Sequence, residues 1–308
     1  MYIICRGAVE IWKSAGQGER FELAVLTAGM LFGEMAVFEN RLRSASATAL
    51  DDVEVLSLAG EDFASLGKAA PHIAVKVQRS LLEVLAQRIT QTAANIEQGS
   101  DQPDEDIAGK LAVPKRNKQK AKVDGFSKAL TAAPLFSVLE EDEVKVTSGL
   151  LHMVRFEEGA SVFQSGMHDP VLFVVNEGEL KIGLPGADDS DLEVVGPGGI
   201  IGTAELFSDG VRATNASVSS EVEVLMLTGK ALSFLATQKP PIAFKIHGVL
   251  LELLSQQLRE VSTELVESED ASKLGQGPAA QQADAAGAED EEEEEIIVEV
   301  SLDEVDPD

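Results

Sequence analysis

The sequence predicts a mainly β fold with flanking helices: two tandem β jelly-roll domains, each followed by helices, and an acidic C-terminal tail. Three observations support this prediction. The chain has 308 residues, which is enough for two domains of about 100–150 residues each. It repeats itself at one offset. Each copy alternates short apolar strands with glycine turns and then continues into an amphipathic helix.

The internal repeat covers residues 23–89, which align without a gap on residues 192–258 at an offset of 169. The clearest identity is the run VEVL, which occurs at 53–56 and again at 222–225. Upstream the offset becomes 171, so that YIICRGAVEI matches FVVNEGELKI. The difference of two residues falls in a hairpin loop, where length changes are tolerated.

The second copy shows its elements most clearly. A helical lead-in is expected over residues 126–150, and a long helix is expected from Ile242 to Leu265, where apolar residues recur every three or four positions. Its counterpart at 73–89 has a weaker stripe. Such stripes pack on their own barrel or across a dimer seam, so a homodimer through the post-barrel helices is one expectation. The expected strands are His152–Phe156, Val162–Gln164, Leu172–Asn176, Glu179–Ile182, Leu192–Val195 and Val222–Leu227.

The first copy starts at the position that matches residue 171 or 172 of the second, so about 45 residues of the second copy have no counterpart. A barrel without its opening strands would expose unpaired backbone edges. We therefore expect further coding sequence upstream, or a partner that completes the barrel.

Composition divides the chain into four segments: a first domain at 1–97, a basic flexible linker at 98–125, a second domain at 126–266 and a disordered acidic tail at 267–308. The tail has 16 acidic residues and one base, Lys273, and it repels itself. We expect a solvated, solubilising tail; the alternative is that its end, IIVEVSLDEVDPD, docks as an added strand or contacts a basic partner. The linker bases, with no acid between them, are Lys110, Lys115, Arg116, Lys118, Lys120 and Lys122.

Charge and residue usage exclude several classes of function. A net charge of -28 disfavours nucleic-acid binding. The single cysteine, Cys5, rules out an intramolecular disulfide, and a cytoplasmic location is expected. No apolar run is long enough to cross a membrane. The four histidines are scattered without metal-ligand spacing, so no metal site is expected and a jelly-roll metal enzyme would lack its ligands. We expect no catalytic residues and no enzyme.

One motif in the first copy has the chemistry of a ligand site. Residues 31–37 read LFGEMAV and residues 43–47 read RSASA. Gly33 allows close backbone approach, and the turn after Glu34 offers free N–H groups that suit an anion. Arg43 supplies a guanidinium for a phosphate. Glu34 suits a sugar hydroxyl, which donates to a carboxylate. Together these groups describe a site for a sugar phosphate.

This motif resembles the phosphate-binding cassette of the cyclic-nucleotide-binding domain family, which is found in receptor proteins, kinase regulatory subunits and gated channels. The resemblance covers residues 1–95 and 126–265. It implies that Glu34 binds the ribose 2′-hydroxyl, that Arg43 binds the cyclic phosphate, and that amides near Ala36 and Ala45 bind the remaining phosphate oxygens. The alternative is a barrel that keeps the cassette shape without a ligand. The implied ligand residues are Gly33, Glu34, Ala36, Arg43, Ser44 and Ala45.

The second copy departs from the pattern. Thr203 follows Gly202 where the family has glutamate, although Arg212 and Ala213 keep the register. A neutral hydrogen bond is weaker than a charge-assisted one, so these four residues form a weaker second site or a structural domain. If the missing carboxylate is the whole difference, Thr203→Glu should restore binding. In the family, a hydroxyl residue after the arginine, here Ser44, is associated with cGMP, whereas Ala213 resembles cAMP sites.

The expected function is that of a regulatory or sensor protein. Cyclic nucleotide, cAMP or cGMP, enters the first copy, the following helices repack, and an unidentified effector protein reads the change. No cofactor is expected, and no DNA-binding or catalytic domain is recognisable. The alternative is a scaffold or dimerisation protein with vestigial pockets. Neither reading involves nucleic acid or a membrane.

Overall fold

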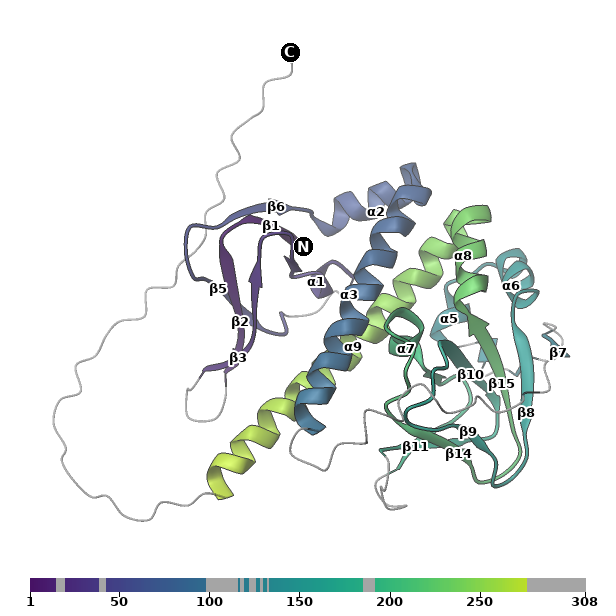
Figure 1. Ribbon diagram of the computed structural model, residues 1–308. Helices are drawn as coiled ribbons and strands as arrows, with labels where there is room; N and C mark the ends of the chain where they lie inside the picture. The colour runs from purple at the N-terminus through teal and green to yellow at the C-terminus, as the bar shows by residue number, and fades with distance from the viewer. Residues whose placement is uncertain are drawn as a thin grey trace.

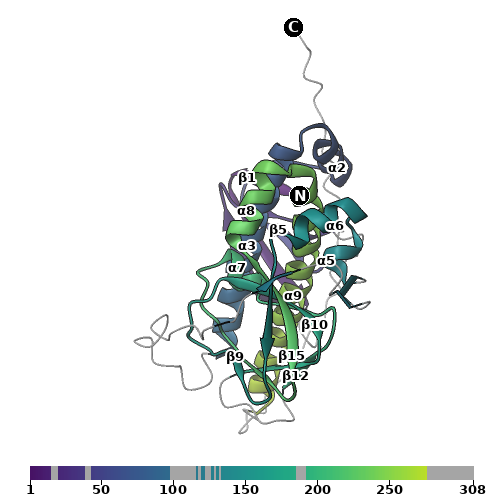
Figure 2. The same cartoon turned by 90° about the vertical axis from the view of Figure 1, so that its right-hand side faces the viewer.

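The computed structural model places two β-rich units on either side of a pair of long helices (Figure 1). The view turned by 90° shows the long helices running along the length of the molecule (Figure 2). The described residues are 1–14, 20–38, 43–97, 116, 119–121, 126–127, 130–131, 133–184 and 192–275. None of the helices in this part of the chain is long and apolar enough to cross a membrane.

The second domain is a two-sheet jelly roll. One sheet has the order β13-β10-β15-β8-β7 and the other has the order β12-β11-β14-β9. Strands β10 and β15 are buried along nearly their whole length, which explains their continuous apolar sequence. The strands are β7 (Gln119–Lys120), β8 (His152–Phe156), β9 (Ser161–Phe163), β10 (Val171–Glu177), β11 (Leu180–Gly183), β12 (Glu193–Val195), β13 (Ile200–Ile201), β14 (Asn215–Val218) and β15 (Val222–Thr228).

Helices before and after this barrel confirm the predicted order of elements. The lead-in forms α5 (Pro134–Ser137) and α6 (Glu141–Ser148). A reciprocal capping box between Glu140 and Glu143 starts α6. A short turn, α7 (Thr203–Phe207), lies within the barrel, and α8 (Gly229–Gln238) and α9 (Pro240–Gly275) follow it. Helix α9 passes the predicted domain end at residue 266, and residues 276–308 of the predicted tail lie outside the described part.

The first domain repeats the later part of this barrel. Its sheets have the orders β4-β1-β6 and β3-β2-β5, and both are antiparallel. Helix α2 (Gly60–Ala69) and helix α3 (Pro71–Glu97) follow the strands. The strands and short helix are β1 (Tyr2–Arg6), β2 (Ala8–Ser14), β3 (Arg20–Thr27), β4 (Leu31–Phe32), α1 (Met35–Phe38), β5 (Ser46–Ala49) and β6 (Glu54–Ser57).

The two barrels differ at their outer edges. In the second domain, β8 pairs with β15 and β9 pairs with β14. Among the described residues of the first domain, the matching strands β6 and β5 have no partner on that side. Val55 and Leu56 on β6 are therefore 37% and 63% exposed, whereas the matching Val224 and Leu225 are fully buried. The expected exposed edge is present.

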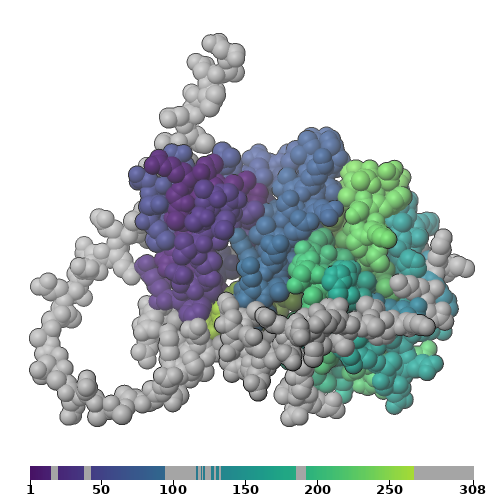
Figure 3. Space-filling model, viewed as in Figure 1, coloured from purple at the N-terminus to yellow at the C-terminus, as the bar shows by residue number. Residues whose placement is uncertain are grey.

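Helices α3 and α9 pack against each other, and α3 lies between the first-domain strands and the second domain (Figure 3). Their apolar stripes share one core that also includes α5 and β15 residues. The contacts at the crossing are reciprocal. Gln78 Nε2 on α3 donates to the Phe244 carbonyl on α9 at 3.1 Å, and His247 on α9 hydrogen-bonds the backbone of Val75 on α3. At the repeat offset Gln78 matches His247, and Val75 matches Phe244. The two apolar stripes therefore pack against each other within one chain, and the homodimer stays a prediction.

Part of the predicted linker belongs to the second domain. Strand β7 pairs with β8, and the neighbouring Ala121 is buried. Arg116 forms a buried ion pair with Asp169 at 2.6 Å. These residues therefore pack on the second domain, although the sequence placed them in the basic flexible linker at 98–125. All the other predicted linker residues lie outside the described part.

Candidate functional site

The first cassette begins at the end of β4, where the chain turns sharply. Gly33 has a φ of 68°, a conformation that side chains rarely adopt. A Cβ at this position would lie 3.0 Å from an Arg43 guanidinium nitrogen. The glycine therefore allows the turn and leaves room for the arginine, whereas the predicted close approach of its backbone to a ligand stays a prediction.

The Glu34 side chain is almost fully buried and is held by an arginine that sequence reasoning missed. Arg88 Nη1 on α3 donates to Glu34 Oε1 at 2.7 Å, and Arg88 Nη2 donates to the Leu31 carbonyl at 2.6 Å. Helix α3 is therefore tied directly to the cassette. A signal was present in the repeat, since the second copy has Thr203 at the position of Glu34 and Gln257 at the position of Arg88.

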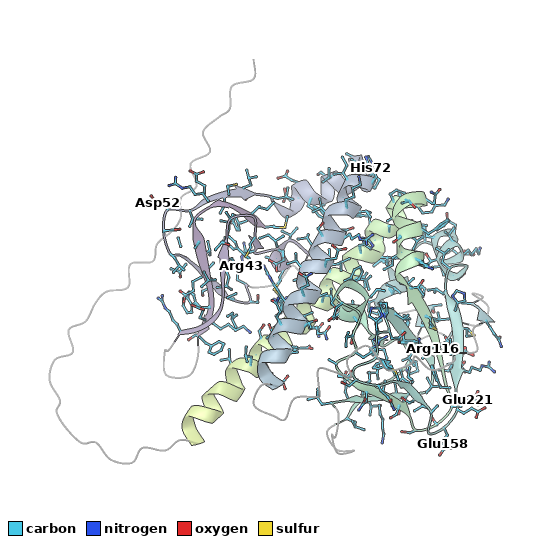
Figure 4. The ribbon with its side chains drawn as sticks, in the orientation of Figure 1. Arg43, Asp52, His72, Arg116, Glu158 and Glu221 are labelled. Carbon is cyan, nitrogen blue, oxygen red and sulfur yellow. The ribbon has the colours of Figure 1, made fainter. Side chains whose placement is uncertain are left out.

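Arg43 is exposed and weakly held. Its Nη1 donates to the Gly33 carbonyl at 3.4 Å, which is long for a hydrogen bond. The next residue, Ser44, donates its hydroxyl to the Met35 sulfur at 3.3 Å. Figure 4 shows Arg43 between the first-domain strands and the long helices. A guanidinium in this state can turn toward a ligand at little cost.

A cavity of about 990 Å³ brings all six predicted ligand residues of the first copy together. One wall is the cassette itself. Helix α3 contributes Gln91 and Thr92, and α9 contributes Leu258 and Ser262. The cavity therefore lies between the first domain and the C-terminal helix of the second, so both copies of the repeat line it.

Among the charged side chains that line this largely apolar cavity, bases outnumber acids. Lys13, Arg43, Arg88 and Arg259 line it together with one carboxylate, Glu34. Lys13 on β2 donates to the Thr263 hydroxyl on α9 at 3.0 Å. Burial, and next the nearby positive charge of Arg259, lower the pKa of Lys13. In a chain with a net charge of -28, this local excess of bases favours an anionic ligand.

The second cassette has the same glycine turn and a different arrangement of side chains. Gly202 has a φ of 83°, and Thr203 is buried at the start of α7. Arg212 is 1% exposed. Its Nη2 donates to the Val171 carbonyl at 2.5 Å and to Asp169 Oδ2 at 3.2 Å. A Cβ at Gly202 would collide with the Arg212 guanidinium, so the arginine fills the space beside the turn.

Asp169 joins Arg212 to Arg116, which Figure 4 shows within the second domain. Arg116 Nη1 and Nη2 donate to the two Asp169 oxygens at 2.9 and 2.6 Å. Burial raises the pKa of this carboxyl, but the hydrogen bonds and charges of the two arginines together lower it by more than burial raises it, so the net shift is downward. Neither Asp169 nor the role of Arg116 followed from any motif. Gly202, Thr203 and Arg212 are brought together as predicted, the exposed Ala213 follows Arg212, and the arginine is bound internally.

The model of the family described as cyclic nucleotide-binding domain matches residues 1–69 and 153–239. The chain is 36% identical over 89 residues to the cyclic AMP receptor protein of Thermus thermophilus. This match covers 29% of this chain and 39% of the relative. It is 26% identical over 140 residues to a CRP-like cAMP-activated global transcriptional regulator of Mycobacterium tuberculosis, covering 45% of this chain and 61% of the relative.

The solved structure of the regulatory domain of Toxoplasma gondii PKA with cAMP aligns with a TM-score of 0.31 and 19% identity. This alignment covers 84% of this chain and 77% of that structure. The chain spans less than two thirds of the length of the two curated relatives.

Proposed function

Because the chain belongs to the cyclic nucleotide-binding domain family, we propose that its first copy binds cAMP or cGMP and that the protein is regulatory rather than catalytic. The observation that carries this proposal is the 990 Å³ cavity, which gathers the whole predicted cassette and an excess of bases. The exposed, weakly held Arg43 supports it as well.

The chemistry of each group fits one part of a cyclic nucleotide. The Arg43 guanidinium binds the cyclic phosphate, and the amides near Ala36 and Ala45 take its remaining oxygens. The Glu34 carboxylate accepts a hydrogen bond from the ribose 2′-hydroxyl while Arg88 holds its other side. Ser44, next to the arginine, is the candidate for distinguishing guanine from adenine.

The signal passes through the two long helices. Arg88 joins α3 to the ribose-binding carboxylate at 2.7 Å, and α9 lines the cavity through Leu258 and Ser262. A ligand that fits one arrangement of these helices better than another shifts the population toward it. An effector protein then reads the changed surface.

A thermal unfolding titration with cAMP and with cGMP tests the proposal. A ligand at 100 times its dissociation constant adds about 2.7 kcal/mol to the unfolding free energy, which raises the melting temperature by several degrees. Arg43→Ala is the control. It removes the guanidinium that would bind the phosphate, and because Arg43 is exposed the fold should be little affected. No stabilisation by either nucleotide in the wild-type chain would favour the alternative, a scaffold with a vestigial pocket.

A further inference from the structure

We propose that the end of the acidic tail, residues 296–300, pairs with the open edge of β6 as an added antiparallel strand. The occupant of this edge is then a segment of the same chain, and neither a second copy nor another protein is needed to cover it. The contact forms on the strands of the first barrel and does not depend on whether the cavity binds a nucleotide.

The open edge of β6 combines unpaired backbone groups with an exposed apolar pair. Among the described residues, β6 pairs with β1 on one side and with no strand on the other. Ile3 and Leu56 lie opposite each other across the β1–β6 pair, and they are 37% and 63% exposed. The matching pair in the second barrel, Val174 and Leu225, is fully buried. An exposed edge with apolar side chains accepts a further strand.

The end of the tail has the same pattern as the strand that covers this edge in the second barrel. There β8 pairs with β15 and reads HMVRF over residues 152–156. Residues 296–300 read IIVEV, so both segments have apolar residues at their second, third and fifth positions and a charged residue at the fourth. In β8 the third and fifth residues are buried and the fourth is exposed. On β6, Val298 and Val300 would therefore face the barrel and Glu299 the solvent.

The match also sets the register of the added strand. In the second barrel, Met153 lies opposite Leu225 and packs against the core that contains this leucine. The corresponding positions are Ile297 in the tail and Leu56 on β6. Ile297 would therefore cover the most exposed apolar side chain of β6.

One pair of charges in this register weakens the added strand. In the second barrel, Arg155 lies opposite Glu223 and bonds to it at 2.7 Å. In the first barrel, Glu299 would lie opposite Glu54, and like charges that face each other destabilise a strand pair. We therefore expect docked and free forms of comparable population, so the tail adds little to the free energy of unfolding.

The chain between α9 and residue 296 is long enough to reach β6. Helix α9 ends at Gly275, a few turns beyond Leu265, which lines the cavity of the first domain. Figure 1 shows this end of α9 below the first-domain strands and β6 along their upper side. Residues 276–295 span up to about 65 Å when extended, whereas a domain of 100 residues is roughly 35 Å across.

A disulfide trap tests the register in the full chain. In a Cys5→Ser background, Leu56→Cys is combined with Ile297→Cys, because residues that face each other on paired strands bring their Cα atoms within disulfide range. Leu56→Cys with Ser301→Cys is the matched control, since residue 301 would lie on the same face of the strand but beyond this range. Under mild oxidation the first pair should form an intramolecular disulfide about tenfold faster than the control. Equal rates would overturn the proposal, and so would a disulfide between two chains, which would assign the edge to a second copy.

Hydrogen exchange followed by mass spectrometry tests the contact without a cross-link. Deletion of residues 296–308 should speed the exchange of the β6 amides about two- to fivefold, because their protection depends on the docked population. Protection of β6 that survives the deletion would show that something else covers the edge, contrary to the proposal.

A charge reversal tests the pair that weakens the added strand. Glu299→Arg places opposite charges across from each other, as in the second barrel, and should slow the exchange of β6 about twofold. Glu295→Arg makes the same change of charge just outside the paired segment and should leave the exchange unchanged. An equal effect of the two variants would show a general charge effect in place of strand pairing and would overturn the proposal.

Discussion

The two cassettes share a glycine turn and differ in what their arginines contact. Each begins with a glycine in the left-handed region, followed by a short helix. In the first copy, Arg43 is exposed beside an open cavity. In the second, Arg212 is buried and bound to Asp169. A cassette can therefore keep its glycine turn while its arginine pairs with an internal carboxylate.

The largest expected difference between the copies is in binding. Arg43→Ala should weaken nucleotide binding by about 100-fold, since it removes charge-assisted bonds to the phosphate, whereas Arg212→Ala should change the affinity less than twofold. Titration calorimetry on both variants measures this. Arg43→Lys is a control that keeps the positive charge and loses the two-pronged guanidinium contact. Equal losses would mean that both copies bind.

The matched leucines of β6 and β15 should differ in stability. Leu225→Ala should lower the unfolding free energy by about 2–5 kcal/mol, as usual for a buried leucine. Leu56→Ala, at a position that is 63% exposed, should cost less than about 0.5 kcal/mol. Chemical denaturation measures both, and a large cost at Leu56 would show that something covers β6 in solution.

The Arg88 contact should matter only in the first copy. Arg88→Gln leaves the buried Glu34 carboxylate without its partner and should cost about 3 kcal/mol of unfolding free energy. Gln257→Ala, at the matching exposed position in α9, should cost less than about 0.5 kcal/mol. Denaturant midpoints of the two variants decide this, and similar small costs would show that Arg88 does not hold α3 to the cassette.

His247 and its counterpart Gln78 should differ in their response to acid. Burial, with the nearby charge of Arg79, lowers the pKa of His247 to about 4 from 6.5. The folded chain protonates His247 less readily than the unfolded chain does. The contribution of the neutral imidazole to the unfolding free energy is therefore complete above pH 6.5 and is lost as the pH falls toward 4. The loss is about 3 kcal/mol at most.

His247→Gln should remove that part of the acid sensitivity, because glutamine does not titrate. The measurement is the unfolding free energy of the variant and of the wild type at pH 7 and at pH 4.5. An equal decrease in both proteins would show that other groups cause the acid sensitivity.

Thr203→Glu should have the smallest effect on binding. The sequence left open whether the missing carboxylate is the whole difference between the copies. The structure adds two obstacles, since Arg212 is held by Asp169 and Gln257 replaces Arg88. We therefore expect the calorimetric stoichiometry to stay unchanged, and a second bound equivalent would show that one carboxylate is sufficient.

The sequence predicted local features and not side-chain partners that lie far apart in the chain. Glycine turns, strand alternation and the cassette spacing depend on neighbouring residues, so the repeat could be located, together with the six first-copy residues that line one cavity. Arg88 and Glu34 are separated by 54 positions and Arg116 and Asp169 by 53. Such pairs depend on how α3 and the interdomain segment pack, and no motif records that packing.

The reciprocal contacts between α3 and α9 join the two halves of one polypeptide. A tether gives the halves an effective concentration that does not fall on dilution. The two sides of this interface can also differ in sequence, because each half of the chain is encoded separately. In a two-fold dimer of identical chains, both sides have the same sequence. Gln78 and His247 occupy matching places, and only one of them titrates. A pair of identical subunits would have two such groups or none, so the tandem arrangement allows proton sensitivity on one side of the seam alone.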